Sequence, residues 1–223
     1  VAEVAMSVPA TLDPEHIGQA RETIIRCFRP LSPEDVVLGQ YAGYTDIDGV
    51  PGDSTTETFV AARLWIDDDR WRGVPFLLRT GKCLAQSKQR VSIIFRTPEN
   101  SLHANPPRPG TVLSFELSGT GEILLSVVGH MPAPARGLAS ITTKMSLDEG
   151  FHTEILPPYA RLLHDILAGD RSAFTRPDGL ESVWDTAQPL LDAKPKPKPY
   201  ARGSWGPQSA TALAGDIGWL LGP

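Results

Sequence analysis

The 223-residue chain has an ordinary globular composition, with 41% hydrophobic and 21% charged residues, and it is long enough for one large core or two small ones. Its net charge of -5 at pH 7 argues against a nucleic-acid partner, since a nucleic-acid surface needs a basic excess. No apolar stretch approaches the roughly 20 residues that cross a bilayer, so the sequence also predicts no membrane partner.

The first predicted element is a helix over residues 13–28. Asp13 can cap its start, Pro14 suits the first turn, and Glu15 lies at the positive end of the helix dipole. Pro30 ends the helix, and a cap-like turn at residues 32–35 leads into a strand over 36–41.

A series of strands follows. Glycine and aspartate in residues 43–53 predict a loop, and the β-branched and aromatic content after it predicts a strand. The predicted strands cover residues 56–66, 74–78, 91–95, 112–117, 122–128 and 139–145. Proline-rich loops are predicted at residues 98–110 and 132–137.

Helical patterns return in the last third of the chain. One helix is predicted from the Pro157-Pro158 pair to Gly169, and a second, over residues 178–191, starts with a capping-box pattern. The alternating Lys and Pro of residues 194–199 predict an extended connector, and a last helix is predicted over 209–221. The order predicts an α+β fold with helices packed on one face of a large, mostly antiparallel sheet.

The most informative motif covers residues 70–82, where four basic residues surround a short apolar run. We interpret residues 74–78 as a buried strand and Arg79-Thr80-Gly81-Lys82 as a turn that leaves it through a glycine. Lys82 would then stand at a strand end, with its ammonium free to meet an anion or a ring of hydroxyls. The simpler alternative is a solvated lysine after a turn.

Several motifs together resemble the C-terminal domain of glucose-6-phosphate dehydrogenase. They occur in the family's order and extend over nearly the whole chain. The matching segments are residues 37–41, 53–61, 70–84, 194–197 and 203–207. The resemblance implies the α+β fold, with the other sheet face used for pairing into a homodimer or tetramer.

The resemblance also implies a reaction. In the family, hydride passes from C1 of glucose 6-phosphate to NADP while a histidine removes the hydroxyl proton, a step of the pentose phosphate pathway. The lysine that matches Lys82 reaches the sugar phosphate. Lys88 is a second candidate substrate-binding residue, because the family's second basic position is Ser87 here and Lys88 is its neighbour. A family glutamine near the substrate aligns with Ser118.

The family binds NADP through a glycine-rich turn of a Rossmann domain, and this sequence has no such glycine fingerprint. The matching catalytic histidine would lie upstream of Val1. We therefore expect residues 1–223 to form a single substrate-binding and oligomerisation domain without the dinucleotide-binding domain. We expect no catalytic or cofactor-binding residue in it, and no activity from this chain by itself.

A different class of function stays open at this point. The chain could be a non-catalytic sugar-phosphate-binding protein, or a regulatory subunit that pairs with a full-length dehydrogenase. The serines at positions 87 and 118 favour this alternative slightly.

Other polar residues are expected to have no role in chemistry. Some family members hold a structural NADP through arginines, but the matching positions here are Ser92, Glu116 and Trp205, so we predict no such site. Surface or structural roles are expected for Arg70, Trp71, Arg79 and the five histidines: His16, His103, His130, His152 and His164.

Metal binding and compartment complete the expectations. The acidic run at residues 67–69 lacks the glycine turn and distal glutamate of a calcium loop, so no metal site is predicted. Cys27 and Cys83 have no zinc or redox spacing and are expected to be free thiols. The chain also starts without a signal-peptide pattern, and the sequence predicts a cytoplasmic location.

Overall fold

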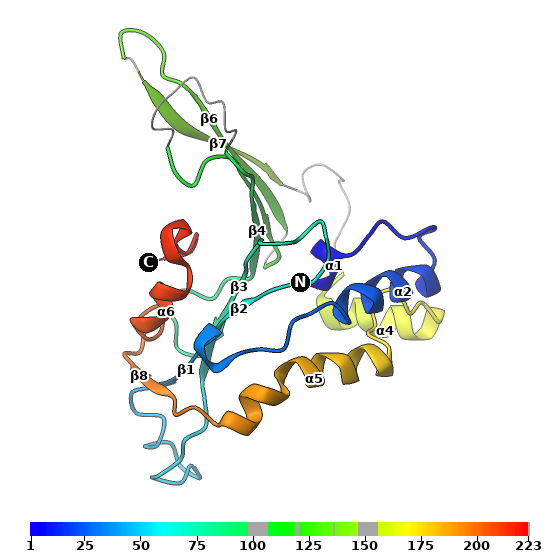
Figure 1. Ribbon diagram of the computed structural model, residues 1–223, viewed down its shortest axis with the longest axis vertical. Coiled ribbons are helices and arrows are strands. Elements are labelled where there is room, and N and C mark those ends of the chain that lie inside the picture. Colours follow the sequence, from blue (N-terminus) through cyan, green and yellow to red (C-terminus); the bar gives the residue numbers. More distant parts are fainter. Residues whose placement is uncertain (98–106, 119–120, 136, 147–155, 223) are drawn as a thin grey trace. The chain divides into compact units, whose positions relative to one another are not determined.

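A computed structural model describes residues 1–97, 107–118, 121–135, 137–146 and 156–222. The chain divides into two compact units, the first made of Val1–Ala85 and Pro158–Pro223, the second of Gln86–Pro157 (Figure 1). Each unit contains one four-stranded sheet. The α+β class and the mostly antiparallel pairing predicted from the sequence are confirmed. The described strands form two four-stranded sheets, whereas the sequence predicted one large sheet.

The sheet of the first unit has the strand order β3-β2-β1-β8. Its strands are β1 (Val36–Tyr41), β2 (Phe59–Leu64), β3 (Phe76–Gly81) and β8 (Lys198–Tyr200). β2 pairs antiparallel with β1 and β3, whereas β8 lies parallel to β1. The end of the Lys-Pro segment is thus an edge strand, which suits prolines because they cannot donate to a sheet ladder.

The first unit also holds the helices. They are α1 (Ala2–Ala5), α2 (Pro14–Ile25), η1 (Pro33–Asp35), α4 (Pro158–Ala168), α5 (Pro177–Ala193), α6 (Ser209–Leu213) and η2 (Gly215–Ile217). The Asp13 cap of α2 is confirmed, since its carboxylate accepts the His16 N–H at 2.9 Å. Two other predictions were wrong. α5 begins after Arg176 with no side-chain cap, and the last helix ends at Leu213.

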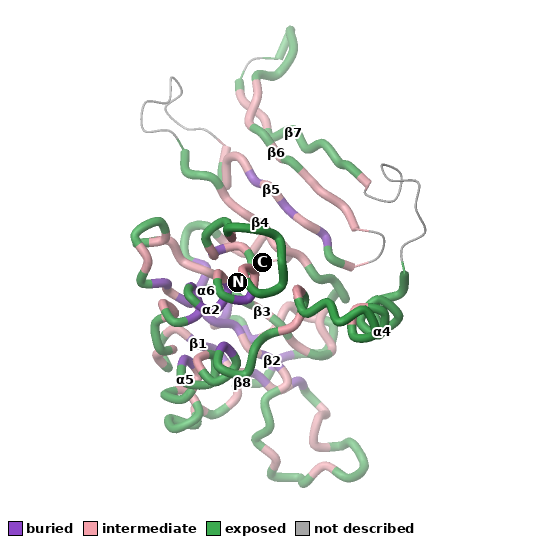
Figure 2. Tube along the Cα trace, turned by 90° about the vertical axis from the view of Figure 1, so that its right-hand side faces the viewer, coloured by how far each residue is buried: buried purple, intermediate pink, exposed green. Residues whose placement is uncertain are grey.

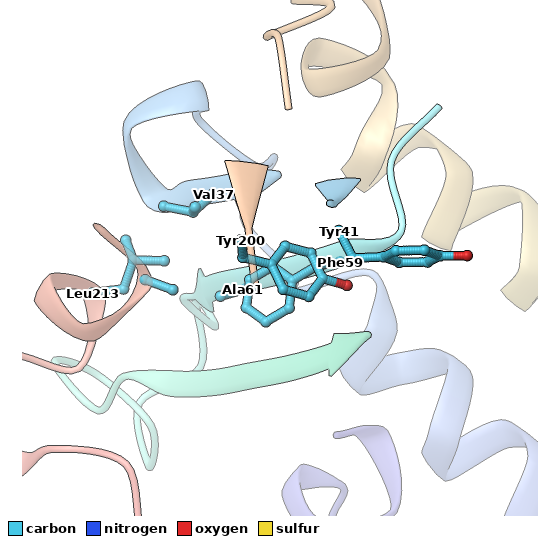
Figure 3. Close-up of a cluster of buried hydrophobic side chains, with 7 residues drawn as sticks. Val37, Tyr41, Phe59, Ala61, Tyr200 and Leu213 are labelled. Atoms are coloured by element: carbon cyan, nitrogen blue, oxygen red, sulfur yellow. The ribbon is translucent and has the colours of Figure 1, made fainter. Parts of the chain in front are cut away.

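The core of the first unit is aromatic (Figure 3). Phe59 is only 2% exposed and lies beside Tyr200, with ring centroids 5.5 Å apart. Ala210 and Leu213 of α6 close the cluster against β1 and β2. A second cluster joins α1 and α2 to Ile66, with Trp71 and Phe76 packed against it.

The sheet of the second unit is a meander with the order β4-β5-β6-β7. Its strands are β4 (Arg90–Ile94), β5 (Val112–Glu116), β6 (Glu122–His130) and β7 (Leu138–Ser146). The buried positions of β5 alternate, and they are Val112, Ser114 and Glu116 (Figure 2). The predicted loop at residues 98–110 lies mostly outside the described residues.

Candidate functional site

The strand before Lys82 differs from its prediction. β3 runs to Gly81, so Gly81 lies within the sheet and does not form the turn. It is needed for space, because a Cβ atom there would come within 2.8 Å of the Phe59 ring. β3 is also half-exposed, whereas residues 74–78 were predicted to be buried.

Lys82 follows β3 directly, and its backbone is held on both sides. Its N–H donates to the Thr58 carbonyl at 2.8 Å. Its own carbonyl accepts the hydroxyl of Tyr200 at 2.7 Å. The side chain is exposed, and within the described residues its ammonium forms no ion pair. The structure therefore combines a fixed backbone with a charged group that is open to solvent.

The turn itself occurs at Cys83, whose φ of 50° lies in the left-handed region. Non-glycine residues rarely adopt this conformation without outside support. Here the Cys83 carbonyl accepts the Gly203 N–H at 2.7 Å, and the Ala85 N–H donates to the Ser204 carbonyl at 2.8 Å. The segment after β8 thus holds the loop that follows Lys82.

Gly206 explains how that segment comes so close. Its φ of 99° suits glycine, and a Cβ atom there would lie 2.2 Å from the Phe59 ring. The Gly-Ser-Trp-Gly motif therefore packs directly on the core residue that also borders Gly81. Two sequence motifs far apart in the chain form one structural unit around Lys82.

Arg79 is placed by stacking. Its guanidinium lies 5.0 Å from the ring centroid of Trp205 and 4.5 Å from that of Trp219, and it donates to the Leu221 carbonyl. Burial lowers the pKa of the Arg79 guanidinium below its ordinary value. The Arg79 side chain thus connects β3 to the C-terminal segment, and these contacts fit the structural role expected for it. Arg70 and Trp71 likewise donate to the Ala5 carbonyl, at 3.1 and 2.8 Å.

Lys88 belongs to the second unit, and its ammonium has a partner. It lies 3.8 Å from Glu116, whose side chain is 7% exposed. Arg90 binds the same carboxylate oxygen at 2.9 Å, and Ser118 donates to the other oxygen at 3.0 Å. Burial opposes ionisation of Glu116, but the hydrogen bonds from Arg90 and Ser118 and the charges of Arg90 and Lys88 hold its pKa below its ordinary value.

Three positions align with arginines of the family's structural NADP site. Each of their side chains contacts another residue of its own unit. Ser92 lies 2.8 Å from Ser114 between their hydroxyl oxygens. Glu116 is paired as described, and Trp205 stacks on Arg79. The prediction that no such NADP site exists stays a prediction.

His16, His164 and the acidic run at residues 67–69 have local partners. His16 lies 2.7 Å from the Asp13 carboxylate, and His164 lies 3.4 Å from that of Asp165. Each aspartate of residues 67–69 pairs with an arginine. No cluster of three potential metal ligands occurs in the described part of the chain. His103 and His152 lie outside the described residues.

Two further features bear on the expectations. Cys27 and Cys83 are free. Among the described helices, none has the length and apolar character to span a membrane.

Tyr200 and Thr58 are the site residues that sequence reasoning missed. Thr58 lies inside a quoted motif but was given no role, and Tyr200 only ends the Lys-Pro segment. The Tyr200 hydroxyl lies 3.1 Å from Thr58 Oγ1 and 3.2 Å from the Thr58 carbonyl. Burial raises the pKa of this hydroxyl. Because the parallel pairing of β8 with β1 has no short-range pattern, nothing in the sequence pointed to these contacts.

Comparison with known proteins decides the family. The family model described as glucose-6-phosphate dehydrogenase, C-terminal domain, matches residues 1–219. The chain belongs to this family. The resemblance stated from the sequence motifs is thereby confirmed.

Relatives of this glucose-6-phosphate dehydrogenase domain are about twice as long as the chain. Glucose-6-phosphate 1-dehydrogenase of Dictyostelium discoideum is 35% identical over 97% of this chain and 46% of its own length. Glucose-6-phosphate 1-dehydrogenase 1 of Mycobacterium tuberculosis is also 35% identical, over 98% of this chain and 47% of its own. The chain thus spans about half the length of these relatives.

The fold is similar to solved structures of the same family. The crystal structure of glucose-6-phosphate 1-dehydrogenase from Mycobacterium avium matches with a TM-score of 0.85 and 32% identity, over 100% of this chain and 48% of the other. A glucose-6-phosphate dehydrogenase in complex with its substrate glucose-6-phosphate matches with a TM-score of 0.88 and 27% identity, again over 100% and 48%.

Proposed function

We propose that the chain is the substrate-binding and oligomerising C-terminal part of a glucose-6-phosphate dehydrogenase. The observation that carries the proposal is the state of Lys82, whose backbone is fixed while its ammonium is exposed. For a lysine that is merely exposed, a fixed backbone adds nothing to stability. For a lysine that binds a ligand, a fixed backbone favours affinity, because less conformational freedom is lost when the ligand binds. The solved relative with bound glucose 6-phosphate supports the choice of ligand.

In this proposal Lys82 donates to the phosphate or to hydroxyls of glucose 6-phosphate. A hydrogen bond from an ammonium to a charged oxygen is about twice as strong as a neutral one, so one such contact matters for affinity. Lys88 is the weaker candidate, since Glu116 already lies 3.8 Å from its ammonium. The chain's own contribution is to bind and orient the sugar phosphate.

The hydride transfer would need groups that this sequence does not contain. NADP would bind a Rossmann domain, and a histidine of the other half would accept the hydroxyl proton. A general base must lie within hydrogen-bond reach of the proton that it removes. We therefore propose that the 223-residue polypeptide by itself does not oxidise glucose 6-phosphate. The free thiols of Cys27 and Cys83 fit a reducing compartment such as the cytoplasm.

The second sheet supplies the surface proposed for self-association. The cross-strand register places one set of apolar residues on the same face. Along the edge of this face, Leu125 and Val127 are 37% and 38% exposed, and Ile141 and Met145 are 55% and 61% exposed. An apolar face of this kind marks an interaction surface. We propose that it pairs with a second copy of the chain.

The proposal is tested by restoring the other half. A joined enzyme, in which the N-terminal half of the Mycobacterium tuberculosis relative precedes Val1, should form NADPH from NADP and glucose 6-phosphate. The 223-residue chain at the same concentration should form none. NADPH formation that scales with the pure chain alone would contradict its assignment as the non-catalytic part. The absence of NADPH formation from a folded joined enzyme would favour the non-catalytic alternative.

A further inference from the structure

We propose that Tyr200 is a positioning residue for substrate binding, acting on Lys82 through its backbone carbonyl. The inference rests on the proposed function, because it assumes that Lys82 contacts glucose 6-phosphate. Tyr200 itself is 5% exposed and lies in the aromatic core, so it would touch no ligand. Its hydroxyl, however, donates to the Lys82 carbonyl at 2.7 Å.

The hydroxyl is part of a short chain of hydrogen bonds. The Tyr41 N–H donates to Thr58 Oγ1 at 3.0 Å, and Thr58 Oγ1 lies 3.1 Å from the Tyr200 hydroxyl oxygen. With the Thr58 hydroxyl donating to Tyr200, the Tyr200 proton is directed to the Lys82 carbonyl. The chain links Tyr41 of β1 and Tyr200 of β8 to Thr58, directly before β2, and to Lys82, directly after β3.

The carbonyl of Lys82 is the point where such support is needed. The next residue, Cys83, has a left-handed backbone that a side chain disfavours. The Tyr200 hydroxyl holds the peptide before Cys83, and the Gly203 N–H holds the peptide after it. Without the Tyr200 hydroxyl, the backbone of Lys82 would be held at its N–H but not at its carbonyl, so the Cα atom that carries the side chain could shift. Small displacements of a binding group cost affinity.

The ring and the hydroxyl of Tyr200 have separable roles. The ring packs at centroid distances of 5.5 Å from Phe59 and 6.3 Å from Tyr41. Tyr200→Phe keeps these ring contacts and removes only the hydroxyl. Tyr41→Phe is the matched control, because Tyr41 is in the same cluster and no side-chain hydrogen bond of its hydroxyl occurs among the described residues.

The experiment compares kcat and KM for glucose 6-phosphate among three variants of the joined enzyme. Lys82→Ala serves as the reference for loss of the contact. Tyr200→Phe is expected to raise KM about threefold to tenfold with little change in kcat. Tyr41→Phe is expected to change neither. A merely destabilised enzyme would lose active fraction, which lowers apparent kcat and leaves KM unchanged.

Amide hydrogen exchange on the 223-residue chain provides a measurement without activity. Tyr200→Phe should speed exchange of the Lys82 amide, which donates to the Thr58 carbonyl, several-fold more than exchange of the β1 amides. If Lys82→Ala raises KM but Tyr200→Phe does not, the positioning role is wrong and the proposed function stands. If Lys82→Ala leaves KM unchanged, the binding role of Lys82 is itself wrong. Unchanged exchange at Lys82 in the Phe variant would also overturn the inference.

Discussion

Lys82 and Lys88 are close in sequence but have opposite surroundings. Lys82 follows a strand of the first unit, where hydrogen bonds fix its backbone and the ammonium is exposed. Lys88 precedes a strand of the second unit, and its ammonium faces a buried carboxylate that Arg90 also binds. Under the proposed function, the comparison teaches that a basic residue at or beside a family position is not sufficient. A binding lysine also needs a defined backbone and a free charged group.

The two units also differ in how far their apolar residues are buried. The first has an aromatic core with residues that are 0–8% exposed, whereas the second has one half-exposed apolar face and a polar cluster at Glu116. The five tryptophans, Trp65, Trp71, Trp184, Trp205 and Trp219, all belong to the first unit. Tryptophan fluorescence therefore follows unfolding of the first unit only, and amide exchange or circular dichroism is needed for the second.

The largest expected effect on the free energy of unfolding comes from a comparison of the aromatic core with the exposed apolar face of the second sheet. Phe59→Ala should destabilise the first unit by about 3–5 kcal/mol, since Phe59 is 2% exposed and contacts Gly206 and Tyr200. Ile141→Ala, at a site 55% exposed, should change the free energy of unfolding of a separated chain by less than about 0.5 kcal/mol.

Urea unfolding and light scattering check this pair of variants. Tryptophan fluorescence should show an early transition for Phe59→Ala. Circular dichroism should show an almost unchanged transition for Ile141→Ala, and light scattering should show weaker self-association for this variant. A mass of 24.1 kDa for the unaltered chain across a wide concentration range would contradict pairing through the second sheet.

A smaller effect is expected from the buried carboxylate. Glu116→Gln should destabilise the second unit by about 1.5–3 kcal/mol, because hydrogen bonds to a charged group are lost and Arg90 remains partly buried. The pKa of Glu116 is lowered in the folded chain, so its stabilisation is present at neutral pH. It should be lost as the pH falls below the ordinary carboxyl range.

Circular dichroism and amide exchange between pH 7 and pH 3 measure this dependence. The unaltered chain should lose β4–β5 protection as the pH falls, and Glu116→Gln should lose less over the same range. Equal pH dependence in both proteins would mean that the Glu116 cluster does not stabilise the second unit. The ion pair between Lys88 and Glu116 would then also be too weak to keep the Lys88 ammonium from a ligand.

The smallest expected effect concerns the stacking around Lys82. Arg79→Lys keeps the charge but loses the planar guanidinium that stacks on the Trp205 and Trp219 rings, which should cost about 1 kcal/mol. The emission of Trp205 and Trp219 should change as the C-terminal segment loosens. Arg72→Lys is the control, since Arg72 pairs with Asp69 at the surface and should have no effect on fluorescence or stability.

Much of the fold could be predicted from the sequence. The strand at residues 36–41 and the helix that Asp13 caps are determined by local patterns, and both were correctly placed. Errors occurred where tertiary contacts override local preference. Gly81 was interpreted as a turn residue, but it is a strand residue whose missing side chain makes room for Phe59. The Asp178-Glu181 capping pattern lies inside α5 because Pro177 already begins the helix.

The candidate site was only partly predictable. Lys82 was identified by a motif and a family resemblance, and its role stays a prediction. Tyr200 was missed because its contact with Lys82 joins residues that are distant in the sequence. For Lys88, the sequence could not show that the Glu116 carboxylate lies 3.8 Å from its ammonium.

The most direct test of the difference between the two lysines is a steady-state comparison of Lys82→Ala and Lys88→Ala in the joined enzyme, with glucose 6-phosphate varied at saturating NADP. Loss of a charge-assisted contact predicts that Lys82→Ala raises KM by about tenfold to a hundredfold, with Lys88→Ala changing it less than about threefold. Tryptophan fluorescence should show that the first unit is folded in both variants, and circular dichroism should show the same for the second unit, which contains Lys88. An unchanged KM for Lys82→Ala, or a larger increase for Lys88→Ala, would contradict the account.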